Sequence, residues 1–257
     1  MLDIQRASIL KRISAALLDV ILIMILSVGV GWIISLATNY DSHIDKIQEY
    51  YDYYNEKYDI DILGTSDKYK NLTEDEQKAY DERLDAANKE YANDSSAIKE
   101  YSLVINLSLV MISIGLFIGI LVSEFVIPLF FKDGQTIGKK IFGICIMKNN
   151  GVRLSTFQLF VRTLIGKYVV ETMIPVLIAL AVLLGILNIV GTIIIIGLFI
   201  TQLILLFATR NHTLIHDLFA YTVVVDKASQ KIFDSEEEKI KYQEWLHEEE
   251  VKRIKTY

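Results

Sequence analysis

Oxygen-bearing side chains lie inside stretches of this sequence that are otherwise apolar enough for lipid. They are Asp19, Glu124, Glu171, Thr201 and Gln202. An ionised side chain near the centre of a bilayer costs ~3 kcal/mol on insertion scales, so a protein usually neutralises such a group or uses it. The carboxylates are therefore candidates for binding a proton or a cation.

These side chains fall at similar depths when each stretch is taken as a membrane-spanning helix. Asp19 lies seven residues after Arg12, which at ~1.5 Å per residue is ~10 Å into the membrane. Glu124 and Gln202 each lie eight residues before the basic residue that ends their own stretch, and Glu171 lies nine residues after an arginine. The spacing predicts a layer of oxygen atoms near the inner face of the membrane.

Carboxylates at one level can coexist only with a proton, a cation or a basic side chain among them. A shared proton suits a proton-coupled carrier, whereas a hard cation such as Na⁺ would also take ligands from Gln202 and Thr201. The alternative is a set of fixed ion pairs with nearby basic residues, namely Arg12, Arg162 and Lys167. The sequence leaves both interpretations open.

The stretch "NHTLIHD" places His212 and His216 four residues apart, with Asp217 next to the second histidine. Two histidines at this spacing on a helix can bind a metal, but no further ligand is well placed, so we expect no metal site. We expect instead that His216 and Asp217 hold a cytoplasmic sheet, or the pair Lys139 and Lys140, against the base of the membrane domain.

The elements that must position these residues follow from composition. The chain has 257 residues, of which 52% are apolar, and a mean hydropathy of +0.35. Its apolar residues gather in blocks 13–38, 102–131 and 157–209, each at least ~20 residues long, as a membrane crossing requires. The last block is long enough for two crossings and contains three turn-forming residues, Gly185, Asn188 and Gly191. The sequence predicts an all-α polytopic membrane protein with four transmembrane helices.

Charge predicts the orientation of these helices. Residues 39–101 hold 17 acidic and 8 basic residues, a net charge of −9, so the rest of the chain carries +3 against a total of −6. Short basic segments stay in the cytoplasm, which places the N-terminus and 132–156 inside and 39–101 outside. We expect a multi-pass protein of the cell membrane with both termini cytoplasmic.

The outer segment 39–101 predicts a helical hairpin. Tyrosines recur at three- and four-residue spacing on both sides of a turn, and Thr73 with Glu76 forms a capping box. We expect the two tyrosine-lined faces to pack together, the alternative being an aromatic face that binds a ligand.

The inner segment 132–156 contains Asn149-Asn150-Gly151 between two short extended runs, which is typical of a β-hairpin. Residues 221–227 would add a third strand to a small cytoplasmic β-sheet. The predicted organisation is thus the N-terminus and first span (1–38), an acidic helical hairpin (39–101), the second span (102–131), a basic β-hairpin loop (132–156), an interfacial helix with the third and fourth spans (157–209), a segment with a strand (210–229) and a charged helical tail (230–257).

Several functions are not expected. The stretch "GQTIGKK" lacks the spacing of a phosphate-binding loop and has Lys140 where that motif needs Ser or Thr. We expect Lys139 and Lys140 to meet anionic lipid heads instead. No arrangement typical of a catalytic nucleophile is present, so we predict no enzyme, no cofactor and no nucleic-acid partner.

Three stretches, "LKRISAALLDVILI", "DGQTIGKKIFGICIMKNNGVRLS" and "TLIHDLFAYTVVVD", together resemble the RDD family of membrane proteins over about residues 6 to 226, apart from the outer hairpin. The family is named for one arginine and two aspartates, which match Arg12, Asp19 and Asp217. The chain departs from the family pattern at Ile137, where proline is common, and at Tyr221, where glycine is common. The resemblance implies a membrane role, and cation/proton exchange is suspected for some members.

The sequence therefore predicts a small RDD-type integral membrane transporter, coupled to a cation or a proton through its embedded carboxylates. Four helices enclose little interior, so we expect an oligomer. The alternative is a membrane scaffold that does not transport and binds a partner protein through the outer hairpin or the charged tail.

Overall fold

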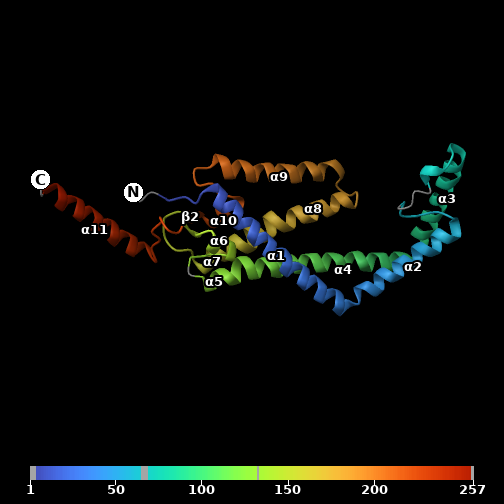
Figure 1. Cartoon of the computed structure of the whole chain (residues 1–257), viewed down its shortest axis with the longest axis horizontal. Helices are drawn as coiled ribbons and strands as arrows, with labels where there is room; N and C mark the ends of the chain where they lie inside the picture. The colour runs from blue at the N-terminus through green and yellow to red at the C-terminus, as the bar shows by residue number, and fades with distance from the viewer. Residues whose placement is uncertain (1–3, 65–68, 132, 256–257) are drawn as a thin grey trace. The chain divides into compact units, whose positions relative to one another are not determined.

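The computed structural model describes residues 4–64, 69–131 and 133–255. In these ranges four helical runs are long and apolar enough to cross a membrane (Figure 1). They are α1 (Ile9–Thr38); α4 (Ser95–Ile120) with η2 (Leu121–Val126) and α5 (Ile127–Phe130); α7 (Thr156–Phe160) with η3 (Val161–Met173) and α8 (Ile174–Leu183); and α9 (Asn188–Ala208). The predicted all-α polytopic class with four spans is confirmed. The segments η2 and η3 are π-helical.

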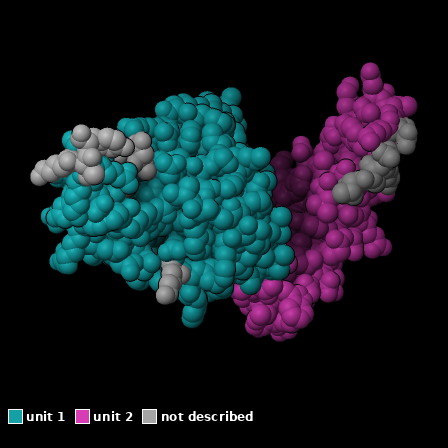
Figure 2. Space-filling view, turned by 60° about the vertical axis from the view of Figure 1, so that its left-hand side comes forward, with its two compact units in different colours: residues 1–27, 116–257 teal, residues 28–115 magenta. Residues whose placement is uncertain are grey.

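The chain divides into two compact units, Met1–Ser27 with Leu116–Tyr257, and Val28–Gly115 (Figure 2). The first unit contains, besides its helical runs, a two-stranded antiparallel sheet of β1 (Ile144–Lys148) and β2 (Thr222–Asp226). The short helices α6 (Ile137–Ile141) and α10 (Ile215–Ala220) directly precede these two strands. Both faces of the sheet are buried, one against Ala7 and Ala15 and the other against Ile4 and Ile232.

The β-hairpin expected within 132–156 forms only at its turn. Asn149-Asn150-Gly151 does form a tight turn, in which the Lys148 amide donates to the Val152 carbonyl at 2.9 Å. Beyond that turn only the isolated bridge between Met147 and Arg153 continues the pairing. The ladder of β1 forms with β2, which lies where the sequence predicts a third strand at 221–227. The two pairings use opposite edges of β1, since the Lys148 amide bonds the Val152 carbonyl and the next amide, that of Asn149, bonds the Tyr221 carbonyl.

The last two spans form a tight hairpin. Helix α8 ends at Leu183, Gly185 takes a positive φ of 72° in the turn, and α9 begins at Asn188. Gly191 does not interrupt the helix as the sequence suggested. It lies inside α9, where an added Cβ would come within 2.4 Å of a methyl carbon of Val182 on α8, so glycine lets the two helices approach closely.

The second unit contains the hairpin of α2 (Tyr40–Tyr58) and α3 (Glu74–Asn93), joined through the 3₁₀ turn η1 (Tyr69–Asn71). Both helices lie where the tyrosine spacing predicts them. The rings of Tyr51 and Tyr91 stack with centroids 5.6 Å apart, and the buried Tyr54 packs edge-on against Tyr91. Aromatic packing of this kind adds to the stability of the hairpin.

The last helix in the described ranges is α11 (Glu236–Lys255), within the segment where the sequence predicts a charged helical tail. Its first turn is capped by Ser235, whose hydroxyl accepts the Glu238 amide at 3.1 Å. The ring of Tyr242 lies 5.5 Å from that of the buried Phe233, which fixes the start of the tail to the first unit.

Candidate functional site

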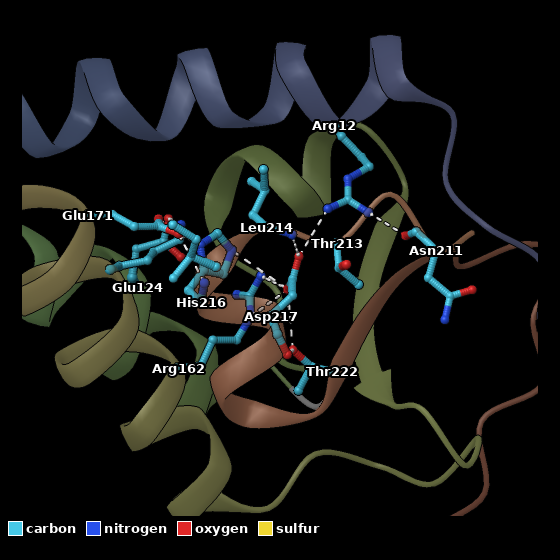
Figure 3. Close-up of polar contacts among 12 residues, drawn as sticks. Arg12, Glu124, Arg162, Glu171, Asn211, Thr213, Leu214, His216, Asp217 and Thr222 are labelled. Atoms are coloured by element: carbon cyan, nitrogen blue, oxygen red, sulfur yellow. Dashed lines mark hydrogen bonds and ion pairs between the residues drawn. The ribbon is translucent and has the colours of Figure 1, made fainter. Parts of the chain in front are cut away.

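A network of buried charges occupies the first unit where α1, η2, η3, α6 and α10 meet. One of its carboxylates, Asp217, accepts hydrogen bonds from two arginines (Figure 3). Arg162 donates from Nε at 3.1 Å and from Nη2 at 2.7 Å to Asp217 Oδ1, and Arg12 Nη2 donates to Oδ2 at 3.1 Å. The Leu214 amide and the Thr222 hydroxyl donate as well, at 3.1 and 3.2 Å. One carboxylate thus joins α1, η3, α10 and β2.

Asp217 is fully buried, yet it stays ionised. Burial by itself favours the neutral carboxyl, but the attraction of Arg162 and the other cations around it outweighs that penalty and holds the pKa of Asp217 below its ordinary value. Because the two arginines neutralise it, the buried carboxylate can hold these elements together.

Asp19 accepts hydrogen bonds from the start of α6. The Thr136 hydroxyl donates to Oδ2 at 2.5 Å, and the Gly138 amide donates to Oδ1 at 2.8 Å. This approach requires glycine, because a Cβ at position 138 would lie 2.3 Å from the Ala15 carbonyl oxygen. The contact brings the next residue, Lys139, to 3.7 Å from Asp19 Oδ2.

Lys139 joins Asp19 to Glu124. Its ammonium lies 3.3 Å from Glu124 Oε2 and 3.2 Å from the Thr136 hydroxyl. The other oxygen of Glu124 pairs with Lys167. Burial lowers the pKa of Lys139 to about 8, even though Glu124 opposes that change.

Glu171 and His216 form the last part of the network. His216 Nδ1 lies 2.7 Å from Glu171 Oε2, and the His216 amide donates to Oε1 at 3.0 Å. Burial, with repulsion from Arg162, lowers the pKa of His216, so its ring is neutral near pH 7. Gln202 hydrogen-bonds Glu171 and also accepts the Ile215 amide at 3.3 Å.

The π-helical segments explain how these residues reach one another. Arg162, Lys167 and Glu171 follow one another at steps of five and four residues along η3. In an α-helix of 3.6 residues per turn, Arg162 and Glu171 would lie about 2.5 turns apart and face opposite sides. A π-helix, whose hydrogen bonds join residues five apart, rotates less per residue. All three side chains then lie on the side that faces the network.

Close packing between η3 and α10 completes the site. A Cβ at Gly166 would lie 2.6 Å from the Cβ of His216 and 2.7 Å from its Cα. Glycine at this position therefore lets α10 lie directly against η3, with His216 and Asp217 turned toward Glu171 and Arg162.

The network is balanced in charge. Its carboxylates are Asp19, Glu124, Glu171 and Asp217, and its basic side chains are Arg12, Lys139, Arg162 and Lys167. With His216 neutral the formal charges cancel. The fixed pairs that the sequence left as an alternative are thus present, with Lys167 on Glu124 and with Lys139 as a partner that the sequence did not suggest.

Of the two roles expected for Asp217, the structure shows contact with the sheet, since the Thr222 hydroxyl at the start of β2 donates to it. Its ion pairs are with Arg12 and Arg162 and not with Lys139 or Lys140, because α10 packs on η3. Lys139 does not face lipid heads but is buried at 7% exposure, because the contact of Gly138 with α1 turns it inward. Lys140 is exposed, with its ammonium 3.8 Å from the centroid of the Phe131 ring.

Thr201 and His212 lie apart from the network. Thr201 is exposed and its hydroxyl donates to the Gly197 carbonyl at 2.8 Å, whereas His212 Nδ1 meets the Leu206 carbonyl at 2.8 Å. Within the described ranges, no group of three or more His, Cys, Asp and Glu side chains could hold a metal ion.

Sequence patterns did not indicate Thr136, Gly138 and Thr163, whose roles depend on contacts more than 35 residues away along the chain.

Comparison with known proteins gives one match. No curated protein and no solved structure matches the chain. A model of the RDD family matches residues 6–221, and Arg12, Asp19 and Asp217, the residues matching the family name, all lie in the network described above. The chain belongs to the RDD family.

Proposed function

We propose that this protein is an RDD-type integral membrane transporter that exchanges a proton for a monovalent cation at Asp19, Glu124 and Lys139. The observation that carries the proposal is the position of the Lys139 ammonium. It is buried among the oxygens of Glu124, Thr136 and Asp19 at 3.3, 3.2 and 3.7 Å. Carboxylate and hydroxyl oxygens are also the ligands that hard cations prefer.

Charge balance couples the two ions. While Lys139 is protonated, the network is neutral and offers no place for another cation. Once Lys139 loses its proton, Asp19 and Glu124 face Lys167 alone, which leaves one negative charge uncompensated. A monovalent cation restores neutrality, so each cation bound corresponds to one proton released.

We further propose that the protein lies in the cell membrane with both termini in the cytoplasm, since the basic segments around the first and second spans stay inside. Lys140 and other exposed basic residues then meet anionic lipid heads. The transporter works as an oligomer and has no enzyme activity.

Proteoliposomes test the proposal directly. With a pH-sensitive dye inside and an imposed Na⁺ or K⁺ gradient, the native protein is expected to move protons in the direction opposite to the cation. Lys139→Gln is expected to abolish this movement, because no proton can leave position 139. The adjacent exposed lysine supplies the matched control, since Lys140→Gln keeps the charge network intact and is expected to retain the flux.

Two outcomes contradict the proposal. One is equal flux in Lys139→Gln and the native protein, and the other is a native protein that moves none of the monovalent cations tested. The second outcome favours a scaffold, for which α11 offers a surface: Ile240, Trp245 and Ile254 are large apolar side chains exposed on an otherwise charged helix.

The pH dependence of cation binding is a separate prediction. Only deprotonated Lys139 leaves room for the cation, and the pKa of Lys139 is about 8. The apparent dissociation constant for the cation should therefore fall by about tenfold per pH unit as pH rises toward that value, and level off above it. Radioactive Na⁺ binding at equal pH on both sides of the membrane measures this. A flat profile between pH 6 and pH 8 would count against the role of Lys139.

A further inference from the structure

A cavity of about 100 Å³ lies beside the charge network. Its wall includes all four basic side chains of the network, Arg12, Lys139, Arg162 and Lys167, together with His216. None of the four carboxylates of the network is among the described residues that line it. Among the described residues, the charged groups at the cavity wall are therefore basic, and each is paired with a carboxylate that does not line the cavity.

Arg162 keeps an unused donor at this wall. The side chain is 1% exposed, and its Nε and Nη2 atoms both bond Asp217. In the part of the chain that the structure describes, the hydrogen bonds of Arg162 come from Nε and Nη2, which leaves the N–H donors of Nη1 for a ligand. A ligand oxygen in the cavity would accept from them.

Lys167 also has bonding capacity left. Of its three N–H donors, one serves Glu124, and the described residues supply no second acceptor. Arginine and lysine together are typical of sites that bind phosphate oxygens.

The remaining wall of the cavity is apolar and comes from membrane spans. Ile13 and Ala16 lie on α1, and Leu206 lies on α9. Ile13 is 41% exposed on the face of α1 that lipid would cover. The cavity thus combines a cationic end with apolar sides, which matches the chemistry of an amphipathic anion.

We propose that this cavity binds one phosphate-type anion, such as the phosphate of an anionic phospholipid, with Arg162, Lys167 and Arg12 facing its oxygens. The volume exceeds the ~30 Å³ share of a single water in the liquid, so it admits a phosphate group but not a large headgroup. The nearer basic groups outweigh the carboxylates behind them, since electrostatic attraction falls with distance.

Lipid retention on the full-length protein tests this site. Native mass spectrometry would compare protein released from nanodiscs that contain equal amounts of phosphatidylglycerol and phosphatidylcholine. Ala16→Phe fills the cavity from its rim without changing a charge, and Val20→Phe, at an exposed position one turn further along α1 that does not line the cavity, is the matched control.

The native protein and Val20→Phe are expected to retain one phosphatidylglycerol. In Ala16→Phe the phenyl ring fills the cavity, which is expected to weaken that binding by about tenfold or more. A second arm places the protein in pure phosphatidylcholine and adds inorganic phosphate. Thermal protection by phosphate of the native protein but not of Ala16→Phe would assign the site to free phosphate rather than to lipid. Equal retention in all three proteins, with no effect of phosphate, overturns the proposal.

Discussion

Replacing Asp217 with asparagine is expected to destabilise the protein by about 3–5 kcal/mol, because the substitution leaves Arg12 and Arg162 buried without a counter-charge. Both guanidinium groups are almost completely buried and both bond the same carboxylate. Unfolding by SDS in mixed micelles, followed by circular dichroism, measures the change in the free energy of unfolding.

Asp226→Asn is the matched control for this prediction. Asp226 pairs with Lys11 at 2.5 Å, but that pair lies at the surface, with side chains 20% and 45% exposed. An exposed pair contributes about 0–1 kcal/mol, so the control should unfold almost as the native protein does. A loss below about 1 kcal/mol in Asp217→Asn would show that the arginines find other partners.

A second variant separates charge from packing. If unpaired positive charge causes the loss, adding Arg12→Gln to Asp217→Asn should recover part of the stability, because one buried cation is removed along with the anion. If the double variant is as unstable as the sum of the two single variants, the effect comes from lost hydrogen bonds and packing instead.

The spans and helices could be predicted from the sequence because they depend on local patterns. A block of apolar residues fixes the length of a crossing, and the tyrosine spacing of 40–58 fixes the buried face of α2. The turn at Asn149-Asn150-Gly151 also formed as predicted. Its hairpin ends at the bridge between Met147 and Arg153. The long ladder of β1 lies on its other edge and depends on β2, a segment more than 70 residues away in the chain.

The partners inside the charge network could not be predicted because they depend on distant contacts. Lys139 lies in a short basic loop, where sequence patterns favour a solvent-facing side chain. Its burial depends on Asp19, which holds α6 through an amide 119 residues away. The same holds for Asp217, whose arginines come from α1 and η3 at 205 and 55 residues' separation.

The π-helical geometry of η3 could not be predicted from the sequence either. Depth along a straight α-helix places Glu171 near the level of Gln202, and the two side chains are hydrogen-bonded. The direction of the side chains could not follow from 3.6-residue periodicity, because Arg162, Lys167 and Glu171 share one side only when the helix is wound more loosely. Segments of this kind occur often at functional sites, which agrees with the concentration of charged groups on η2 and η3.

Gly138→Ala is expected to disrupt the network from its backbone and to cost about 1–3 kcal/mol, as overpacking of a tight site does. The added Cβ would lie 2.3 Å from the Ala15 carbonyl oxygen and 2.8 Å from Asp19 Oδ1, so α6 must move away from α1. That movement carries Lys139 away from Glu124, and proton-coupled flux in proteoliposomes should fall together with stability.

Gly29→Ala on α1 is the control, since a Cβ at that position meets nothing within 4 Å and should leave both measurements unchanged. If Gly138→Ala matches the native protein in stability and flux, the close contact between α6 and α1 is not what holds Lys139 in the network.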